Sequence, residues 1–264
     1  MSSISFDTGA VAVITGAGGG IGYATARRFA EGGASVALID ASDSVHEARD
    51  KLAADTPDVR FESFVADVTS EDELALVRDQ VVDAFGRADH LAIVAGVVQT
   101  AAAVEDLTLE EWNRVFGVNS IGVFLTAKTF IPLLKQRPQN TLVAVASYWA
   151  RTNPPLFAAY SASKSTVLSL VQTLAAELAP SGVRVNAVAP GQINTGMHRN
   201  ALTSEAESRG ITFEEMKSIE WGKIPLGVAG EPEVIADAVA FLSSPASSYI
   251  TGAALDVNGG VVSH

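Results

Sequence analysis

The chain has 264 residues, of which 48% are hydrophobic and only 18% are charged, which excludes a disordered chain and allows one large or two small domains. Its net charge of −12 argues against a nucleic-acid partner or an anionic membrane surface. The absence of cysteine excludes disulfides, thiolate nucleophiles and Cys-ligated metals.

Buried-strand patterns alternate with helical patterns along the whole chain. The pattern predicts strands at 10–14, 35–39, 59–66, 90–95, 141–146, 183–188 and 253–257. It predicts helices at 20–31, 42–54, 70–85, 107–134, 158–178 and 232–242, with an irregular region at 190–230. Such alternation indicates right-handed βαβ units and a parallel sheet covered on both faces. Because no linker or composition shift divides the chain, we predict a single α/β domain over residues 1–264.

A glycine-rich turn, Thr15-Gly16-Ala17-Gly18-Gly19-Gly20-Ile21-Gly22, joins the first predicted strand to the first predicted helix. Glycines permit positive φ and let backbone N–H groups approach a pyrophosphate, whose charge the positive end of a helix stabilises. The alternative is that the glycines only form a tight turn. The position of the glycine-rich turn between a strand and a helix of an alternating chain favours a dinucleotide site at the carboxyl ends of the strands.

Asp40 ends the second predicted strand, 18 residues beyond Gly22. A carboxylate there accepts hydrogen bonds from both adenosine ribose hydroxyls and repels a 2′-phosphate. Neither Gly19 nor Ala41 supplies the arginine that would hold such a phosphate, so NAD is favoured over NADP. The alternative is that Asp40 caps the next helix, a role for which Ser42 competes.

Asp67 and Val68 end the third predicted strand. They are candidates for the wall of an adenine site, with Asp67 bonding the edge of the base. The alternative for the Asp67 carboxylate is to cap the helix that begins at Ser70, where Glu73 is the expected capping-box partner.

Tyr160 and Lys164 lie four residues apart on the predicted helix 158–178, so both project from the same face. A cation beside a phenol favours the phenolate and lowers the tyrosine pKa by roughly 1 to 3 units. Lys164 and a second positive charge would together bring Tyr160 into the range of a general base. A bare Tyr-x-x-x-Lys also arises by chance, so this interpretation depends on the neighbouring motifs.

Taken together, these motifs resemble the short-chain dehydrogenase/reductase family over residues 15–260. The match consists of the glycine turn, Ser147 located 13 residues before Tyr160, the Tyr-x-x-x-Lys pair, and Pro190-Gly191. The resemblance implies a Rossmann-type doubly wound parallel sheet of about seven strands. It also implies a catalytic set of Asn119, Ser147, Tyr160 and Lys164.

One motif departs from the family pattern. Where the family has Asn-Asn-Ala-Gly after the fourth strand, this chain has Ile93-Val94-Ala95-Gly96, so only Ala95 and Gly96 match. Because the missing asparagines mainly fix neighbouring backbone, we expect their loss to affect local bracing more than the chemistry.

The implied chemistry is hydride transfer between an alcohol and a nicotinamide. Tyr160 would take the alcohol proton during oxidation and return it during reduction. Ser147 would position the substrate oxygen, and Lys164 would also hold the nicotinamide ribose. Asn119 would tether a water that connects Lys164 to solvent, or alternatively satisfy a kink in its helix.

The resemblance also implies which residues surround the ligands. Expected cofactor contacts are Gly16, Gly20, Ile21, Gly22, Asp40, Asp67, Val68, Ala95, Gly96, Tyr160, Lys164, Pro190, Gly191, Ile193 and Thr195. Expected substrate contacts are Ser147, Trp149, Phe157 and Tyr160, with Gln99, Asn153 and Gln192 as candidate polar contacts. Residues 191–230 are expected to form a lid, in which Thr195 bonds the nicotinamide carboxamide. The four histidines show no metal spacing, so no metal is expected.

We therefore predict an NAD-dependent oxidoreductase acting on a secondary alcohol or polyol and its ketone. The alternatives are a 3-oxoacyl or diketone reductase of the same family, or a non-catalytic nucleotide-sensing Rossmann module. The expected small-molecule partner is an alcohol or ketone. Helices 107–134 and 158–178 carry more apolar surface than one sheet needs, and the resemblance implies that they pair across two-fold axes in a homotetramer. With no signal-peptide pattern at 1–7 and no apolar run of about 18 residues, we expect a cytoplasmic protein without a membrane partner.

Overall fold

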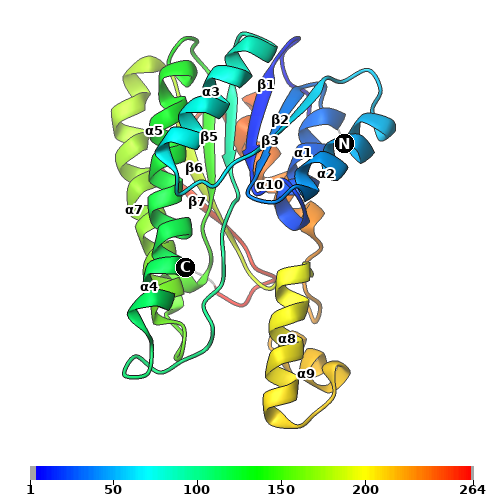
Figure 1. Ribbon diagram of the computed structural model, residues 1–264, viewed down its shortest axis with the longest axis vertical. Coiled ribbons are helices and arrows are strands. Elements are labelled where there is room, and N and C mark those ends of the chain that lie inside the picture. Colours follow the sequence, from blue (N-terminus) through cyan, green and yellow to red (C-terminus); the bar gives the residue numbers. More distant parts are fainter. Residues whose placement is uncertain (1–3, 263–264) are drawn as a thin grey trace.

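The computed structural model describes residues 4–262. Its centre is a seven-stranded parallel sheet in the order β3-β2-β1-β4-β5-β6-β7 (Figure 1). The strands are β1 (Val11–Thr15), β2 (Ser35–Asp40), β3 (Phe61–Val65), β4 (His90–Ile93), β5 (Thr141–Val145), β6 (Arg184–Pro190) and β7 (Ala254–Val257). The order reverses between β1 and β4, which is where α/β sheets of this type bind ligands. The predicted α/β class and single domain are confirmed.

Helices cover both faces of the sheet, which explains why the central strands are apolar along their whole length (Figure 1). One face carries α3 (Glu71–Phe85), α5 (Val123–Leu134) and α7 (Ala158–Leu178), and the other carries α1 (Gly20–Glu31), α2 (Ser44–Asp55) and α10 (Pro232–Ser243). Each layer has its own core. Phe130 and Val171 belong to the first core, and Phe29 and Leu52 to the second.

The predicted helix 107–134 is divided into three parts. They are α4 (Leu109–Phe116), a π-helical stretch (Gly117–Gly122) and α5. Such wider turns often occur at functional sites, and this one contains Asn119. The run Leu109–Leu134 is long and apolar enough to cross a membrane, but 61% of its most apolar window is buried inside the protein, as in a core helix.

The predicted irregular region 190–230 contains two helices that sequence reasoning missed, α8 (Gly196–Arg209) and α9 (Phe213–Trp221). Both begin with a side-chain cap: the Thr195 hydroxyl accepts from the His198 N–H, and Thr212 forms a capping box with Glu215. These helices project from the sheet as a lobe, which we call the α8–α9 lobe (residues 191–230) (Figure 1).

The two ends of the α8–α9 lobe meet where it leaves the sheet. The Asn194 N–H donates to the Gly230 carbonyl at 2.8 Å, and the Gly230 N–H donates to the Gln192 carbonyl at 3.0 Å. Within the lobe, Leu202, Ala206 and Met216 form a small core separate from the two cores on the sheet. The lobe is therefore a local excursion of the chain with its own packing.

Candidate active site

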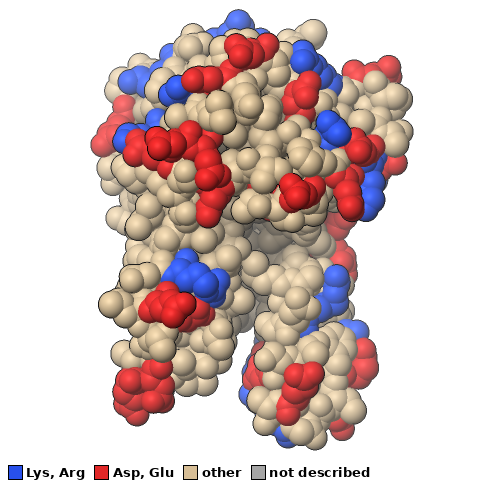
Figure 2. All heavy atoms as spheres, viewed as in Figure 1, with Lys and Arg blue, Asp and Glu red and all other residues tan. Residues whose placement is uncertain are grey.

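A cleft of about 870 Å³ lies at the carboxyl ends of the strands, bounded on one side by the α8–α9 lobe. Figure 2 shows the molecule hollowed beside this lobe, between it and the part of the surface around α4. The cleft is lined by most of the predicted ligand contacts, namely Gly16, Gly20, Ile21, Gly22, Asp40, Ala95, Gly96, Ser147, Trp149, Phe157, Tyr160, Lys164, Pro190, Gly191, Ile193 and Thr195. The fold thus brings residues from both halves of the chain to one place.

The glycine turn packs so closely that side chains are excluded at two positions. Gly16 has φ +69°, and a Cβ atom there would lie 2.8 Å from the Cα atom of Ala95. A Cβ atom on Gly22 would lie 2.0 Å from the carbonyl oxygen of Gly16. Helix α1 begins without a side-chain cap and without an acidic residue in its first turn. Its positive end therefore remains available to an anion in the cleft.

The Asp40 carboxylate faces this turn from the end of β2. Its Oδ2 atom accepts the Gly18 N–H at 2.9 Å, and its Oδ1 atom accepts the Ser42 N–H at 3.0 Å. Asp40 does not cap the following helix, because α2 has Asp43 at its N-cap. The carboxylate is thus fixed at the wall of the cleft next to the glycine turn.

Asp67 and Val68 are not among the residues that line this cleft, and their contact with an adenine stays a prediction. The Asp67 carboxylate accepts the Thr69 N–H at 2.8 Å, while its own N–H donates to Glu73 at 2.8 Å. Val68 is 7% exposed and packs with Leu74 in a small cluster. The Asp67 carboxylate thus takes part in the turn before α3, which was the alternative role for it.

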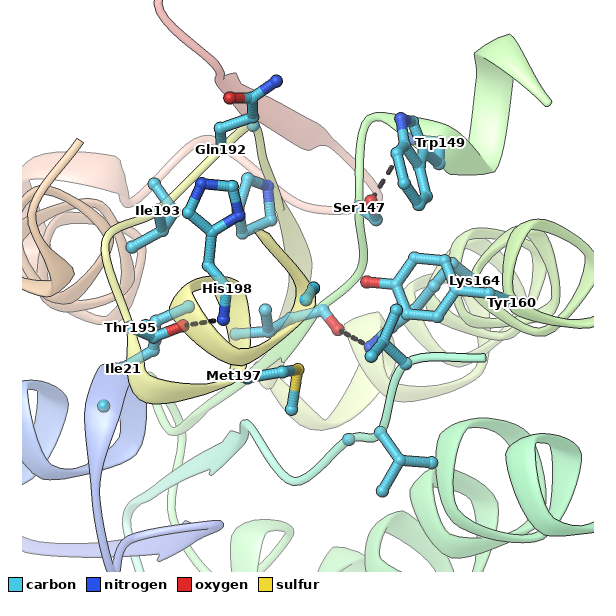
Figure 3. A pocket seen from close by; sticks show the side chains of 18 of the residues that line it. Ile21, Ser147, Trp149, Tyr160, Lys164, Gln192, Ile193, Thr195, Met197 and His198 are labelled. Carbon is cyan, nitrogen blue, oxygen red and sulfur yellow. Dashed lines mark hydrogen bonds between the residues drawn. The ribbon is translucent and has the colours of Figure 1, made fainter. Parts of the chain in front are cut away.

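Tyr160 and Ser147 present their hydroxyls to the same part of the cleft, Tyr160 from α7 and Ser147 from the end of β5 (Figure 3). The Ser147 Oγ atom accepts the Trp149 N–H at 3.2 Å. The Trp149 ring stands perpendicular to the Tyr160 ring, with the ring centroids 5.7 Å apart, and packs on Phe157 at 4.6 Å. An aromatic wall therefore borders the two hydroxyls.

Lys164 lies one helical turn beyond Tyr160 and is only 3% exposed. Its Nζ atom donates to the Val145 carbonyl at 2.9 Å and lies 5.9 Å from the centroid of the Tyr160 ring (Figure 3). The predicted trio of Ser147, Tyr160 and Lys164 is thus assembled by α7 and the end of β5.

A family model described as enoyl-(acyl carrier protein) reductase matches residues 16–262. The chain belongs to the short-chain dehydrogenase/reductase family. The 3-oxoacyl-[acyl-carrier-protein] reductase of Thermotoga maritima is 36% identical to this chain. The alignment covers 96% of this chain and 98% of the length of the reductase.

Two solved structures of this family extend the comparison. An NAD+-bound xylitol dehydrogenase has a TM-score of 0.89 and 33% identity, covering 96% of this chain and 99% of its own. The L-sorbose reductase of Gluconobacter frateurii, complexed with NADPH and L-sorbose, has a TM-score of 0.93 and 26% identity, covering 99% of both chains. The relatives are oxidoreductases, and these structural neighbours hold a nicotinamide cofactor, so hydride transfer is the chemistry of this short-chain dehydrogenase/reductase.

In the protein alone, burial is the largest influence on the pKa values of Tyr160 and Lys164. Burial lowers the pKa of Lys164 to about 8. Burial also raises the pKa of Tyr160, against an opposing hydrogen bond with Ser147. In the protein alone, Lys164 therefore does not bring the Tyr160 pKa below its ordinary value, because desolvation of the phenolate is the larger effect. The combined effect of Lys164 and a second positive charge on the Tyr160 pKa stays a prediction.

Asn119 lies behind the cleft rather than in its wall, and it is fully buried. Its Oδ1 atom accepts the Val97 N–H at 2.8 Å, and its Nδ2 atom donates to the Val97 carbonyl at 2.9 Å and to Ser163 Oγ at 3.1 Å. The side chain thus holds the segment after β4 against α7. The proposed water contact stays a prediction.

Other groups hold the backbone where the chain departs from Asn-Asn-Ala-Gly. The Thr15 hydroxyl accepts the N–H groups of Val94 at 3.2 Å and of Ala95 at 3.3 Å. Asn119 clamps Val97 two residues further on. Backbone near Gly96 is therefore braced from β1 and from the π-helical stretch.

Sequence reasoning did not assign the lining residues that the α8–α9 lobe contributes, among them Ala201, Leu202, Glu205, Arg209, Glu220 and Lys223. The sequence of this segment has no clear helical period, so it does not indicate which of these side chains face the cleft. Of the three candidate polar contacts, Gln192 lines the cleft, whereas Gln99 and Asn153 do not.

Proposed function

We propose that the chain is an NAD-dependent oxidoreductase that transfers a hydride between a secondary alcohol, or a polyol, and its ketone. One observation carries the proposal: a single cleft holds the glycine turn with Asp40, and also the hydroxyls of Ser147 and Tyr160. The glycine turn and Asp40 suit a dinucleotide, and the two hydroxyls suit an alcohol or a carbonyl oxygen.

The residues present fit a nicotinamide dinucleotide. A Cβ atom at Gly16 or Gly22 would collide with backbone, so the turn keeps its N–H groups open beside the uncapped start of α1. These groups would hold the pyrophosphate, and Asp40 would hold the adenosine ribose and repel a 2′-phosphate. Lys164 would hold the nicotinamide ribose. When bound, the cofactor supplies the hydride acceptor or donor and, in its oxidised form, a positive charge.

The side chains supply proton transfer and orientation. Ser147 donates or accepts a hydrogen bond at the substrate oxygen and keeps that oxygen beside Tyr160. The Tyr160 phenolate accepts the alcohol proton during oxidation, and the phenol returns it during reduction. Lys164, with a pKa of about 8, is mostly protonated at neutral pH and stabilises the phenolate. Asn119 would carry the water that passes the proton onward.

The charges of the α8–α9 lobe favour an uncharged alcohol over a substrate carried on a phosphate-bearing arm. The two lobe cations that line the described cleft, Arg209 and Lys223, contact the carboxylates of Glu205 and Glu220 respectively. A phosphate would have to displace these carboxylates. The 3-oxoacyl alternative therefore has less support than the secondary alcohol.

We further propose a cytoplasmic homotetramer. Ile121 and Phe124 are 52% and 48% exposed on the helices outside the sheet, which supports an interface there. Sedimentation velocity tests the assembly, and a single monomeric species would refute it.

The test of function is a panel of secondary alcohols, polyols and ketones, followed through the absorbance of the reduced nicotinamide with NAD and NADP in parallel. We expect turnover with at least one alcohol–ketone pair and a preference for NAD. Tight NADH binding without turnover on any substrate would favour the nucleotide-sensing alternative.

A further inference from the structure

Gln99, in the segment between β4 and α4, is a polar side chain buried to 2% exposure. Its Oε1 atom accepts the N–H groups of Ala159 at 2.8 Å and Tyr160 at 3.2 Å. Its Nε2 atom donates to the Leu156 carbonyl at 2.8 Å. Backbone N–H groups only donate and carbonyls only accept, so these three partners fix the orientation of the amide. The side chain is thus occupied by backbone rather than directed to substrate.

The two N–H groups that Gln99 binds are those that a helix cap normally binds. Helix α7 begins after Phe157, which provides no side-chain cap. Ala159 and Tyr160 are the second and third residues of the helix, whose N–H groups have no partner within it. Gln99 supplies the missing cap from a distant part of the chain. Because the third residue is Tyr160, the cap acts on the backbone of the catalytic tyrosine.

The segment that carries Gln99 is itself held firmly. Arg114 donates to the Val98 carbonyl at 2.8 Å, and Glu111 accepts the Thr100 N–H at 2.7 Å. These contacts flank Gln99 on both sides. Val98 lines the cleft, so Gln99 links the wall of the cleft directly to the start of the catalytic helix.

Gln99 also stabilises the turn before α7. Leu156 has φ +72°, a conformation that non-glycine residues adopt rarely. Its carbonyl accepts from Gln99 and from the Ala102 N–H at 3.1 Å. Both sides of the entry to α7 are therefore tied to one segment, residues 99–102.

We propose that Gln99 is a positioning residue, which caps α7 across the fold and thereby holds the Tyr160 hydroxyl at Ser147. This inference rests on the proposed function, because it takes Tyr160 as the proton donor and acceptor. Loss of the cap lets the first turn of α7 fray, so the phenol is misplaced while the glycine turn that holds the dinucleotide stays intact. The influence of the nearby Ser147 hydroxyl, which opposes the rise in the Tyr160 pKa caused by burial, is weakened at the same time.

The test compares Gln99→Met, which removes all three hydrogen bonds at similar size, with Gln99→Glu, which keeps an acceptor for the two N–H groups. We expect Gln99→Met to lower kcat by roughly 10- to 100-fold, with the NADH dissociation constant within about twofold of wild type. We also expect the pH at which kcat increases to be higher for Gln99→Met than for the wild type. Gln99→Glu should recover most of kcat, because an anion at a helix N-terminus also caps.

The matched control is Gln80→Met, the same substitution at an exposed position of α3, away from the cleft and from the helices of the proposed interface. It should leave kcat and NADH affinity unchanged. A kcat for Gln99→Met within about twofold of wild type, or a proportional loss of kcat and NADH affinity with no rescue by Gln99→Glu, would overturn the proposal.

Amide hydrogen exchange provides a readout that needs no turnover. We expect the amides of Ala159 and Tyr160 to exchange at least about tenfold faster in Gln99→Met than in wild type, and to stay protected in Gln99→Glu. Should Gln99→Met fail to fold, Gln99→Leu in the presence of NADH replaces it in both measurements. Wild-type protein that turns over no substrate refutes the proposed function, whereas unchanged exchange in the variant refutes the cap.

Discussion

Lys164 places an ammonium group in a nearly closed interior, and this predicts a specific dependence of stability on pH. Burial lowers its pKa from 10.5 to about 8. A shift of one unit corresponds to about 1.4 kcal/mol, so the protonated side chain costs the folded state about 3 kcal/mol. Lys164→Met removes this cost. It also removes the hydrogen bond from Nζ to the Val145 carbonyl, a loss that does not depend on pH.

The sign follows from proton binding. Between pH 8 and pH 10.5 the folded Lys164 is mostly neutral, whereas the unfolded side chain is mostly protonated. Unfolding therefore takes up a proton in this window, and the free energy of unfolding of the wild type rises with pH. Below pH 8 the full cost is present, and above pH 10.5 it has vanished. The advantage of Lys164→Met over wild type should therefore shrink by about 3 kcal/mol across the window.

Urea denaturation of both proteins at a series of pH values from neutral to alkaline, followed by tryptophan fluorescence and circular dichroism, measures this difference. The pH-independent loss of the hydrogen bond shifts the whole curve and leaves its slope unchanged. A difference between the two proteins that stays constant over the window would show that Lys164 is not desolvated in the folded protein.

Three further predictions concern the cleft. Tyr160→Phe should abolish turnover while leaving the NADH dissociation constant within about twofold, measured by nucleotide fluorescence, because only the proton is lost; parallel loss of both would give Tyr160 a structural role. Asp40→Ala should weaken the binding of NAD and lower the ratio of kcat/KM with NAD to kcat/KM with NADP. An unchanged ratio would show that Asp40 does not select the cofactor. Gly16→Ala, with a Cβ atom 2.8 Å from Ala95 and φ +69°, should lower the free energy of unfolding by more than about 1 kcal/mol and weaken NADH binding. Urea denaturation with unchanged midpoint and slope would contradict that close approach.

The sheet could be predicted from the sequence because its strands are buried on both faces. β1 and β5 are apolar at nearly every position and fully buried, so their continuous apolar runs can be recognised without knowledge of the tertiary contacts. Most predicted strand and helix boundaries lie within two residues of the structure. The glycine turn, Asp40 and the trio around Tyr160 also reach the cleft as predicted, since parallel strands bring their carboxyl ends to one edge.

The rest depended on contacts that a linear pattern does not contain. Helix α8 buries only Leu202 and Ala206, too few apolar positions to give a clear helical period. The Asp67 carboxylate accepts a hydrogen bond from the Thr69 N–H in the turn before α3, a local contact that the strand pattern does not reveal. The pKa of Tyr160 follows from its burial, which only the assembled fold defines. Gln99 reaches its partners about 60 residues away, so its role had no signal in the sequence.

Because the base of the α8–α9 lobe is closed by backbone hydrogen bonds, substrate selectivity can change independently of cofactor binding. Backbone bonds among Gln192, Asn194 and Gly230 join the start and finish of this excursion, and Met216 lies in a core that the sheet does not share. An exchange of residues 197–229 would alter which substrate is accepted, while Thr195, the glycine turn and the side chains on α7 would stay in place. Directed evolution of substrate range should therefore concentrate its library on this one contiguous insert.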